Sequence, residues 1–263
     1  MPGGFVEVQG VSLRYGGAGG TLAVDGLDMA VEQGQFAALV GPSGCGKSTM
    51  MKLTTGLVRP DAGTVHVAGK QVDGPVSMAG MAFQNPSLLP WRTTLKNVML
   101  PLEIVQPHRR QLSSQRAAYT QQAEDLLTLV GLKGFGSKFP WQLSGGMQQR
   151  SNLCRALIHD PALLMLDEPF GALDAFTREE LWQVMRDLHQ EKKMTVILVT
   201  HDLREAVYLA DRIFVMSARP GKVIVTKDIT FPRPRPIDLT YTGEFNAIVH
   251  ELRGYIAEAR AVA

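Results

Sequence analysis

Residues 41–49 read GPSGCGKST and place three glycines, a lysine and adjacent hydroxyl side chains directly after the apolar run FAALV at 36–40. They fit the pattern G-x-x-x-x-G-K-[S/T], in which glycines let backbone N–H groups turn inward around a polyphosphate. The residues that follow favour a helix, whose positive N-terminal end attracts the same anion. We expect Lys47 to reach the β- and γ-phosphates of a nucleotide and the Ser48 hydroxyl to coordinate Mg²⁺.

The whole loop is predicted to bind the nucleotide. Its members are Gly41, Pro42, Ser43, Gly44, Cys45, Gly46, Lys47, Ser48 and Thr49. The alternative is a Gly-rich turn with an incidental lysine, which the preceding strand and the following helix disfavour. Cys45 is most simply a small filler inside the loop, and a redox role is the alternative.

Two acidic residues end another apolar run, LLMLDEP at 163–169. A carboxylate at the tip of a buried strand, here Asp167, can hold a metal-bound water beside such a loop. The adjacent Glu168 can polarise an attacking water as general base. Alone, this pattern is weak, because strands often end in charged residues. Together with the phosphate loop it indicates nucleotide hydrolysis.

A second candidate anion site lies at LSGGMQQR, residues 143–150. Ser144 stands where a helix N-cap would, and the two glycines after it leave the helix end bare. A single nucleotide site does not need two such cradles far apart in the chain.

At this point the chain resembles the ATP-binding cassette ATPases over nearly its whole length. The LSGGQ-type signature is the most specific element, with Met147 in place of the commoner glutamine. The motif order also agrees: the phosphate loop, Gln84 in FQNPSLLPW, LSGGMQQR, LLMLDEP, GALD at 171–174, and His201 in VTHD.

In that family two cassettes close head to tail over two ATP molecules, which implies a homodimer. The resemblance implies that Ser144, Gly145 and Gly146 contact the γ-phosphate held by the other subunit. It also implies that Asp174 communicates across the dimer.

The same resemblance implies roles around the nucleotide. Gln84 would approach Mg²⁺ and the water while relaying the nucleotide state to a membrane partner, so that Ser48, Gln84 and Asp167 are the expected Mg²⁺ ligands. His201 would hold the γ-phosphate, and Tyr15 would stack on adenine. The alternatives are a loop glutamine, a histidine that caps a strand end, and a tyrosine packed on the small sheet.

Composition limits the remaining classes. The 263 residues carry 27 Lys and Arg against 25 Asp and Glu, a formal net charge of +2, which is not the basic footprint of nucleic-acid binders. Two cysteines, Cys45 and Cys154, cannot build a disulfide framework. We expect no secretory signal and no membrane span. If the protein works at a membrane, other chains must bring it there, and the family resemblance implies the cytoplasmic face.

The predicted fold is an α/β P-loop NTPase core with a mostly parallel sheet, preceded by an antiparallel β-subdomain and interrupted by a helical insertion. The predicted ATPase domain spans 1–230, with a core of 1–85 and 155–230. The helical subdomain spans 86–154 and contains the signature. The stretch FPRPRP at 231–236 predicts a stiff connector to a C-terminal helix at about 243–259, within an extension over 231–263.

Several shorter patterns support this division. FVEV, VSLRY and LDMAV are predicted as separate strands of the antiparallel sheet, and Thr177 with Glu180 is predicted to form a capping box. One helix of the insertion shows an apolar stripe, made of Tyr119, Ala123, Leu126, Leu127 and Val130.

A free-standing cassette of this kind resembles the ATPase subunit of a bacterial importer, which implies permease subunits and, indirectly, a periplasmic binding protein. The segment 88–104, with Trp91, is expected to receive a permease helix, or else to pack within the helical subdomain. The amino-acid sequence resembles that of the nitrate, sulfonate and taurine importer branch, which implies a small anionic cargo. The alternative class is a soluble switch or assembly factor without a permease.

Overall fold

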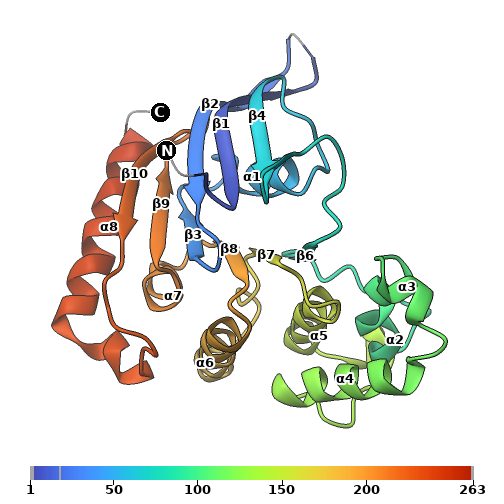
Figure 1. Cartoon of the computed structure of the whole chain (residues 1–263). Coiled ribbons are helices and arrows are strands. Elements are labelled where there is room, and N and C mark those ends of the chain that lie inside the picture. The colour runs from blue at the N-terminus through green and yellow to red at the C-terminus, as the bar shows by residue number, and fades with distance from the viewer. Residues whose placement is uncertain (1–2, 18, 262–263) are drawn as a thin grey trace. The chain divides into compact units, whose positions relative to one another are not determined.

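The computed structural model describes residues 3–17 and 19–261, which form two compact units. The core unit contains the chain up to Val76 and from Arg186 onward, and the helical unit contains Ser77–Met185. In Figure 1 the helical unit is coloured mainly green and yellow. Among the described residues, no helix combines the length and the apolar character needed to cross a membrane.

The core unit contains an antiparallel sheet in the order β2-β1-β4-β5. Its strands are β1 (Val6–Tyr15), β2 (Thr21–Val31), β4 (Ala62–Val67) and β5 (Lys70–Gln71). The separation of FVEV from VSLRY was wrong, because both belong to β1. Gly10 has a φ of +57° between them, and the register to β2 shifts between Val8 and Val11. The glycine therefore makes a bulge within one strand instead of a turn between two.

A second set of strands in the core unit is mostly parallel. Strands β8 and β9 pair in parallel with either side of β3, and β10 is antiparallel to β9. These are β3 (Phe36–Val40), β8 (Thr195–Val199), β9 (Arg212–Met216) and β10 (Val223–Asp228). Every residue of β3 and β8 is buried, as their continuous apolar runs predict for strands covered on both faces.

Several helical segments lie wholly within the core unit. They are α1 (Lys47–Thr54), α7 (Leu203–Leu209), the 3-10 turn η3 (Ile237–Tyr241) and α8 (Gly243–Ala261). Helix α8 runs beside β9 and α7 (Figure 1). Its residues Phe245 and Leu252 are fully buried, which confirms the predicted C-terminal helix and its packing on the core.

The strand register fixes one edge of the core unit. Leu39 pairs with Val199, and Val40 pairs with Val215, so β3 and β8 end side by side. The phosphate loop that follows β3 and the turn that follows β8 therefore leave the same edge. Ligands of open α/β sheets bind at such carboxyl edges.

The stretch at 231–236 is packed and is not a free connector. Arg235 is only 1% exposed, and its guanidinium donates hydrogen bonds to the carbonyl oxygens of Val207, Tyr208 and Ala210 at 2.8–3.0 Å. The carbonyl of Arg235 accepts in turn from the hydroxyl of Tyr208. The prolines therefore position arginines that secure the end of α7.

The helical unit contains two parallel strands and several helices. They are β6 (Ala79–Ala82), β7 (Leu163–Asp167), α2 (Thr94–Val98), η1 (Leu100–Glu103), α3 (His108–Gln111), α4 (Arg116–Leu129), η2 (Pro140–Gln142) and α5 (Gly145–Leu157). Helix α5 packs on β6 and against α2 and α4. The five residues of the predicted apolar stripe on and just after α4 are all buried, which confirms that prediction.

Helix α6 (Ala175–Lys192) passes the unit boundary in sequence and begins earlier than predicted. Thr177 lies inside its first turn, so the capping box of Thr177 and Glu180 was wrong. The Asp174 carboxylate accepts a hydrogen bond from the Thr177 backbone N–H at 3.0 Å. Asp174 therefore takes the capping role, because a short acidic side chain just before the helix reaches its first free N–H groups.

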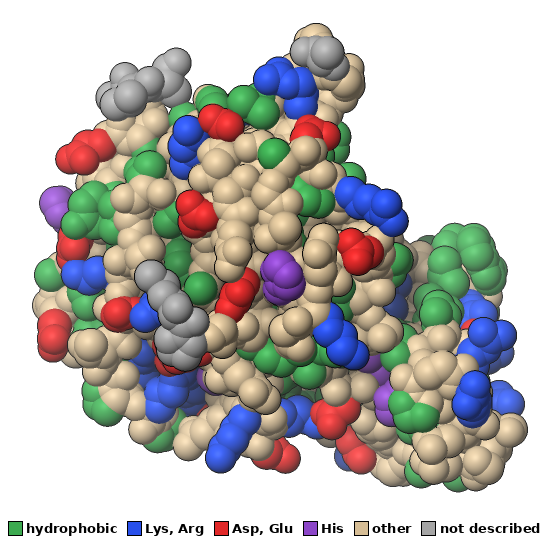
Figure 2. Space-filling model, turned by 45° about the horizontal axis from the view of Figure 1, so that its top comes forward, with side chains coloured by type: hydrophobic (Ala, Val, Ile, Leu, Met, Phe, Trp, Pro, Cys, Tyr) green, Lys and Arg blue, Asp and Glu red, His purple; other side chains and the backbone are tan. Residues whose placement is uncertain are grey.

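The surface agrees with the nearly balanced composition. Acidic and basic side chains are interspersed over most of the face shown in Figure 2. This face therefore carries both signs of charge, in line with the formal net charge of +2.

Candidate active site

The phosphate loop joins the buried strand β3 to helix α1 in the core unit. The N-cap of α1 is Gly46, in a left-handed conformation with φ +102°, and no side chain caps the helix. A Cβ on Gly46 would lie 2.8 Å from Val24 Cγ1 and 3.0 Å from the Ala23 carbonyl oxygen. Glycine is therefore required for both backbone conformation and space. The bare helix end that results is suited to an anion.

Lys47 is 7% exposed, and its ammonium group is held by the loop itself. Nζ donates to the carbonyl oxygens of Gly41 and Pro42, both at 2.9 Å. A buried charge needs such partners, because desolvation without them is costly. Ser48 is exposed on the first turn of α1, whereas Thr49 is buried. The lysine and the serine hydroxyl thus occupy different environments, as their different expected roles require.

Cys45 is packed inside the loop and is 1% exposed. Its Sγ lies 4.0 Å from Met216 Sδ and 3.8 Å from Lys47 Nζ. Burial raises the pKa of the thiol above its ordinary value, and nearby Lys47 opposes this only in part. A raised pKa suppresses the reactive thiolate, so the structure favours the interpretation of Cys45 as a packing residue.

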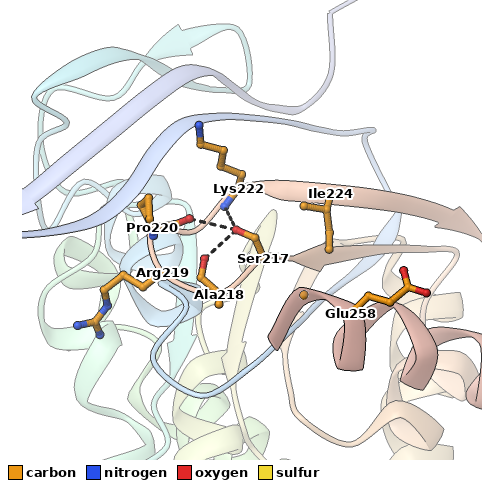
Figure 3. A pocket seen from close by; sticks show the side chains of 8 residues that line it. Ser217, Ala218, Arg219, Pro220, Lys222, Ile224 and Glu258 are labelled. Carbon is orange, nitrogen blue, oxygen red and sulfur yellow. Dashed lines mark hydrogen bonds between the residues drawn. The ribbon is translucent and has the colours of Figure 1, made fainter. Parts of the chain in front are cut away.

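A turn from elsewhere in the core unit lies against the loop. Residues 217–222 connect β9 to β10, and Arg219 Nε donates to the Gly44 carbonyl oxygen at 3.1 Å. The turn is closed internally, because Ser217 Oγ accepts from the Lys222 backbone N–H and lies 3.0 Å from the Pro220 carbonyl oxygen (Figure 3). This support joins residues 175 positions apart, so no local sequence pattern predicts it.

The other side of the same turn borders a cavity of about 380 Å³ (Figure 3). Its walls come from residues 217–222, from Ile224 on β10, and from Glu258 and Ala259 on α8. The cavity is therefore separate from the phosphate loop, although the two share the turn.

His201 follows β8 and is exposed. The turn that carries it is tied to β3, because the Thr200 backbone N–H donates to the Leu39 carbonyl oxygen at 3.2 Å. Asp202 then caps α7 by accepting from the N–H groups of Arg204 and Glu205. His201 is thus placed at the same strand edge as the phosphate loop.

Tyr15 is the last residue of β1, and 40% of it is exposed. An exposed aromatic ring at a strand end can offer a flat face to an adenine ring. Nothing in the strand itself requires this function, so adenine stacking stays a prediction.

In the helical unit, two carboxylates end strand β7. Asp167 is 8% exposed, and Glu168 adopts a left-handed backbone conformation with φ +46°. Gln84, which follows β6, donates from Nε2 to Glu168 Oε2 at 3.0 Å. Because β6 and β7 run in parallel, the residues after them meet at one edge. The structure thus brings Gln84 to Glu168, a residue 84 positions later in the sequence.

The signature residues lie at the start of α5. Ser144 is the N-cap, and its Oγ accepts from the Met147 backbone N–H at 3.3 Å, as the sequence predicts. Ser144 and Gly145 are exposed, and Gly146 is half-buried. This helix end therefore presents N–H groups to solvent without a bulky side chain.

Asp174 is exposed and acts locally. Hydrogen bonds from Thr177, first from its backbone N–H, hold the pKa of the Asp174 carboxyl below its usual value. The structure thus assigns it a helix cap, and its communication across a dimer stays a prediction.

The donor atoms of the candidate ligands show whether these residues suit Mg²⁺. Ser48, Asp167 and Gln84 all offer oxygen atoms, which are the donors that Mg²⁺ prefers. The Gln84 amide uses its nitrogen toward Glu168, which leaves its oxygen as the atom for a cation. The donor set therefore fits the ion.

Comparisons with known proteins agree with this geometry. The family model described as ABC transporter matches residues 24–171. The aliphatic sulfonates import ATP-binding protein SsuB of Bacillus licheniformis is 42% identical over 217 residues, covering 82% of this chain and 81% of that protein. The taurine import ATP-binding protein TauB of Escherichia coli K12 is 40% identical over 223 residues, covering 85% of each.

A solved structure is also similar. The dimeric post-hydrolysis structure of the ATP-binding cassette MJ0796 bound to ADP and Pi has a TM-score of 0.74 and 29% sequence identity. The match covers 86% of this chain and all of that chain. The sequence relatives and the structural relative thus lead to the same type of nucleotide-binding fold.

Proposed function

The chain belongs to the ABC transporter family, and from this we propose that it is the ATP-hydrolysing subunit of an importer. The observation that carries the proposal is Lys47, a buried ammonium group held only 2.9 Å from two carbonyl oxygens of its own glycine loop. Such a cation is ready to exchange neutral carbonyls for phosphate oxygens, with which its bonds are stronger.

The core unit binds the triphosphate. Backbone N–H groups of the loop and of the first turn of α1 surround the phosphates, and Lys47 neutralises their charge. Ser48, Asp167 and Gln84 would hold Mg²⁺, which would further neutralise the charge of the phosphate oxygens. Tyr15 stacks on the adenine, and His201 contacts the γ-phosphate.

Glu168 is the general base for the attacking water. The Glu168 carboxylate accepts a hydrogen bond from the Gln84 amide. This bond orients the carboxylate, which can then accept a proton from a water beside it. Gln84 thus positions the base.

Two copies of the chain close head to tail around the nucleotide. Ser144, Gly145 and Gly146 then offer the open N-terminus of α5 to the γ-phosphate held by the other copy. Asp174 completes the contact between copies. The dimeric state of the similar cassette MJ0796 supports this arrangement.

ATP hydrolysis by this subunit drives uptake through a separate permease, which the chain contacts at the cytoplasmic face of a membrane. The names of the relatives, which refer to import of aliphatic sulfonates and of taurine, support a small anionic cargo. We propose that a periplasmic binding protein delivers this cargo. Trp91, which is 70% exposed in the segment 88–104, is the proposed point of contact with a permease helix.

The hydrolytic assignment is tested with Glu168→Gln. The variant keeps the size of the side chain and loses its ability to take a proton, so it should bind ATP normally and accumulate a stable dimer. Phosphate release and sizing chromatography with ATP measure the two effects. Phosphate release near the wild-type rate would overturn the base assignment.

The importer assignment is tested by purification from membranes. A tagged chain should be recovered with an integral-membrane protein. A chain that hydrolyses ATP and dimerises, but is recovered without a membrane partner, would instead be a soluble switch or assembly factor.

A further inference from the structure

Helix α5 carries three polar side chains that face the segment after β6. Gln149, Asn152 and Arg155 are spaced by three residues and therefore share one face of the helix. Gln149 is 2% exposed and Asn152 is fully buried. Gln149 Nε2 and Asn152 Nδ2 donate to the same acceptor, the carbonyl oxygen of Phe83, at 3.2 and 2.9 Å. We call these three residues the α5 clamp.

Arg155 extends the clamp along the same segment. Its guanidinium donates to the carbonyl oxygens of Pro86 and Ser87 at 2.5 and 3.2 Å. It also donates to Asn152 Oδ1 at 2.7 Å. The last bond fixes the orientation of the Asn152 amide, because a guanidinium only donates and must meet the oxygen. The Asn152 nitrogen is therefore directed at Phe83.

The acceptor of the clamp is the peptide immediately before Gln84. A carbonyl oxygen has two lone pairs, and here two amide donors occupy both. The orientation of the Phe83–Gln84 peptide is thereby fixed, and with it the direction in which the Gln84 side chain leaves the backbone. Gln84 then donates to Glu168 at 3.0 Å. A chain of hydrogen bonds thus leads from α5 to the proposed general base.

We propose that Gln149, Asn152 and Arg155 are positioning residues that hold Gln84 in register with Glu168. The helix that carries them begins at Ser144, so a contact made at its N-terminus and the placement of Gln84 depend on one rigid element. This rests on the proposed roles of Gln84 and Ser144. When a nucleotide contacts the signature residues at the start of α5, the clamp transmits this contact to Gln84 and Glu168 of the same chain.

A clamp that only stabilised the fold would have a different effect on ATP turnover. Buried carbonyls need partners, and an unsatisfied one costs about 1–3 kcal/mol wherever it lies. In that case the loss of the clamp would lower stability and leave turnover of the folded protein unchanged. The two readings are separated by asking whether the effect of the clamp depends on Gln84.

The test measures ATP turnover of Asn152→Ala, of Gln84→Ala and of the double variant. A positioned hydrogen bond of about 1 kcal/mol corresponds to roughly a fivefold change in rate. We expect Asn152→Ala to lower kcat about fivefold with an unchanged KM for ATP. In the Gln84→Ala background, the same change should have no further effect. Radiolabelled phosphate release keeps the slow background measurable.

A matched control is available in the same unit. Gln122 on α4 also donates from its amide to a backbone carbonyl, that of Ile158, at 3.0 Å. Gln122→Ala should lower the melting temperature without changing kcat. Gln149→Ala removes the other donor to Phe83 and tests the clamp independently if Asn152→Ala folds poorly.

Each outcome either supports or contradicts the positioning role of the clamp. A loss of kcat that is equally large with and without Gln84, or a loss of stability alone, would overturn the clamp. If Gln84→Ala turns over ATP at the wild-type rate, Gln84 has no role in hydrolysis, and the proposed function of that residue fails instead. The first result concerns Asn152 and Gln149, and the second concerns Gln84, so the two failures are distinguishable.

Discussion

Gly221 lies so close to Cys45 that a Cβ added to it would be 2.0 Å from the Cys45 carbonyl oxygen. The same glycine donates its N–H to the Ala23 carbonyl oxygen at 2.9 Å. The turn between β9 and β10, strand β2 and the phosphate loop therefore meet through one residue that has no side chain. The shape of the loop depends on this close approach.

We therefore expect Gly221→Ala to displace the phosphate loop. The variant should lose roughly 1–3 kcal/mol of stability, the usual cost of overpacking, and should bind ATP more weakly. Thermal unfolding and titration with a fluorescent ATP analogue measure these effects. Gly254→Ala is the matched control, because a Cβ at this position on α8 meets nothing within 4 Å. Equal behaviour of the two variants would contradict the prediction.

Lys47 should determine nucleotide affinity. Lys47→Ala removes the charge that faces the loop, and we expect ATP binding to weaken by at least about tenfold, since charge-assisted bonds are about twice as strong as neutral ones. Lys52→Ala on the exposed side of the same helix controls for net charge. Calorimetric titration with ATP gives both affinities. An unchanged affinity in Lys47→Ala would exclude the loop as the phosphate site.

Ser144→Arg should separate nucleotide binding from dimer formation. The large cation fills the open end of α5, whereas the phosphate loop lies in another part of the sequence. In a Glu168→Gln background, the variant should bind ATP as a monomer and show no ATP-dependent dimer on sizing chromatography. Ser113→Arg, at an exposed position of the helical unit, should still dimerise. A normal dimer with Ser144→Arg would argue against the signature as a contact in trans.

Arg235 should be important for stability. Its guanidinium satisfies three carbonyls near the end of α7, where a positive charge is also favoured. Burial lowers its pKa to about 10, so the group is still charged at neutral pH. We expect Arg235→Ala to cost about 3 kcal/mol in denaturant unfolding, because buried acceptors lose their partner. Arg253→Ala, at an exposed position on α8, should change stability by less than about 0.5 kcal/mol.

Stability should fall on mild acidification. Burial lowers the pKa of His159 below its ordinary value of 6.5, so the unfolded chain binds this proton more readily than the folded chain. Between the folded pKa and 6.5 the free energy of unfolding therefore rises with pH and falls as acid is added. The denaturant midpoint, measured from about pH 7 to about pH 5, should show this slope. His159→Gln should reduce this slope, and the rest should come from His189, because burial lowers the pKa of that side chain as well.

The local chemistry was predictable because it is written in contiguous residues. A phosphate loop needs glycines, a lysine and a hydroxyl at fixed spacing, and the structure gives that segment a strand before it and a helix after it. The N-cap at Ser144 was predictable for the same reason, since a cap interacts with residues only three positions away. The apolar stripe of α4 follows from helical periodicity alone.

Helix starts and connectors were less predictable. Thr177 looked like a cap, but Asp174 is three residues closer to the turn and accepts the hydrogen bond itself. The prolines around Arg233 and Arg235 indicated a stiff connector, but sequence patterns do not show that these arginines meet the carbonyls of a helix distant in sequence. The α5 clamp was not predicted, because its acceptor on Phe83 lies 66 and 69 positions from the two amide donors.

The sequence by itself determined which residues can bind phosphate and take a proton, because those capacities belong to side-chain types and short spacings. Only the tertiary structure decided that Gln84 meets Glu168, 84 positions along the chain, that Gly221 supports the phosphate loop, and that two amides of α5 share one carbonyl. The physical reason is that strand register and helix packing select these contacts, and both are set by the burial of many residues together.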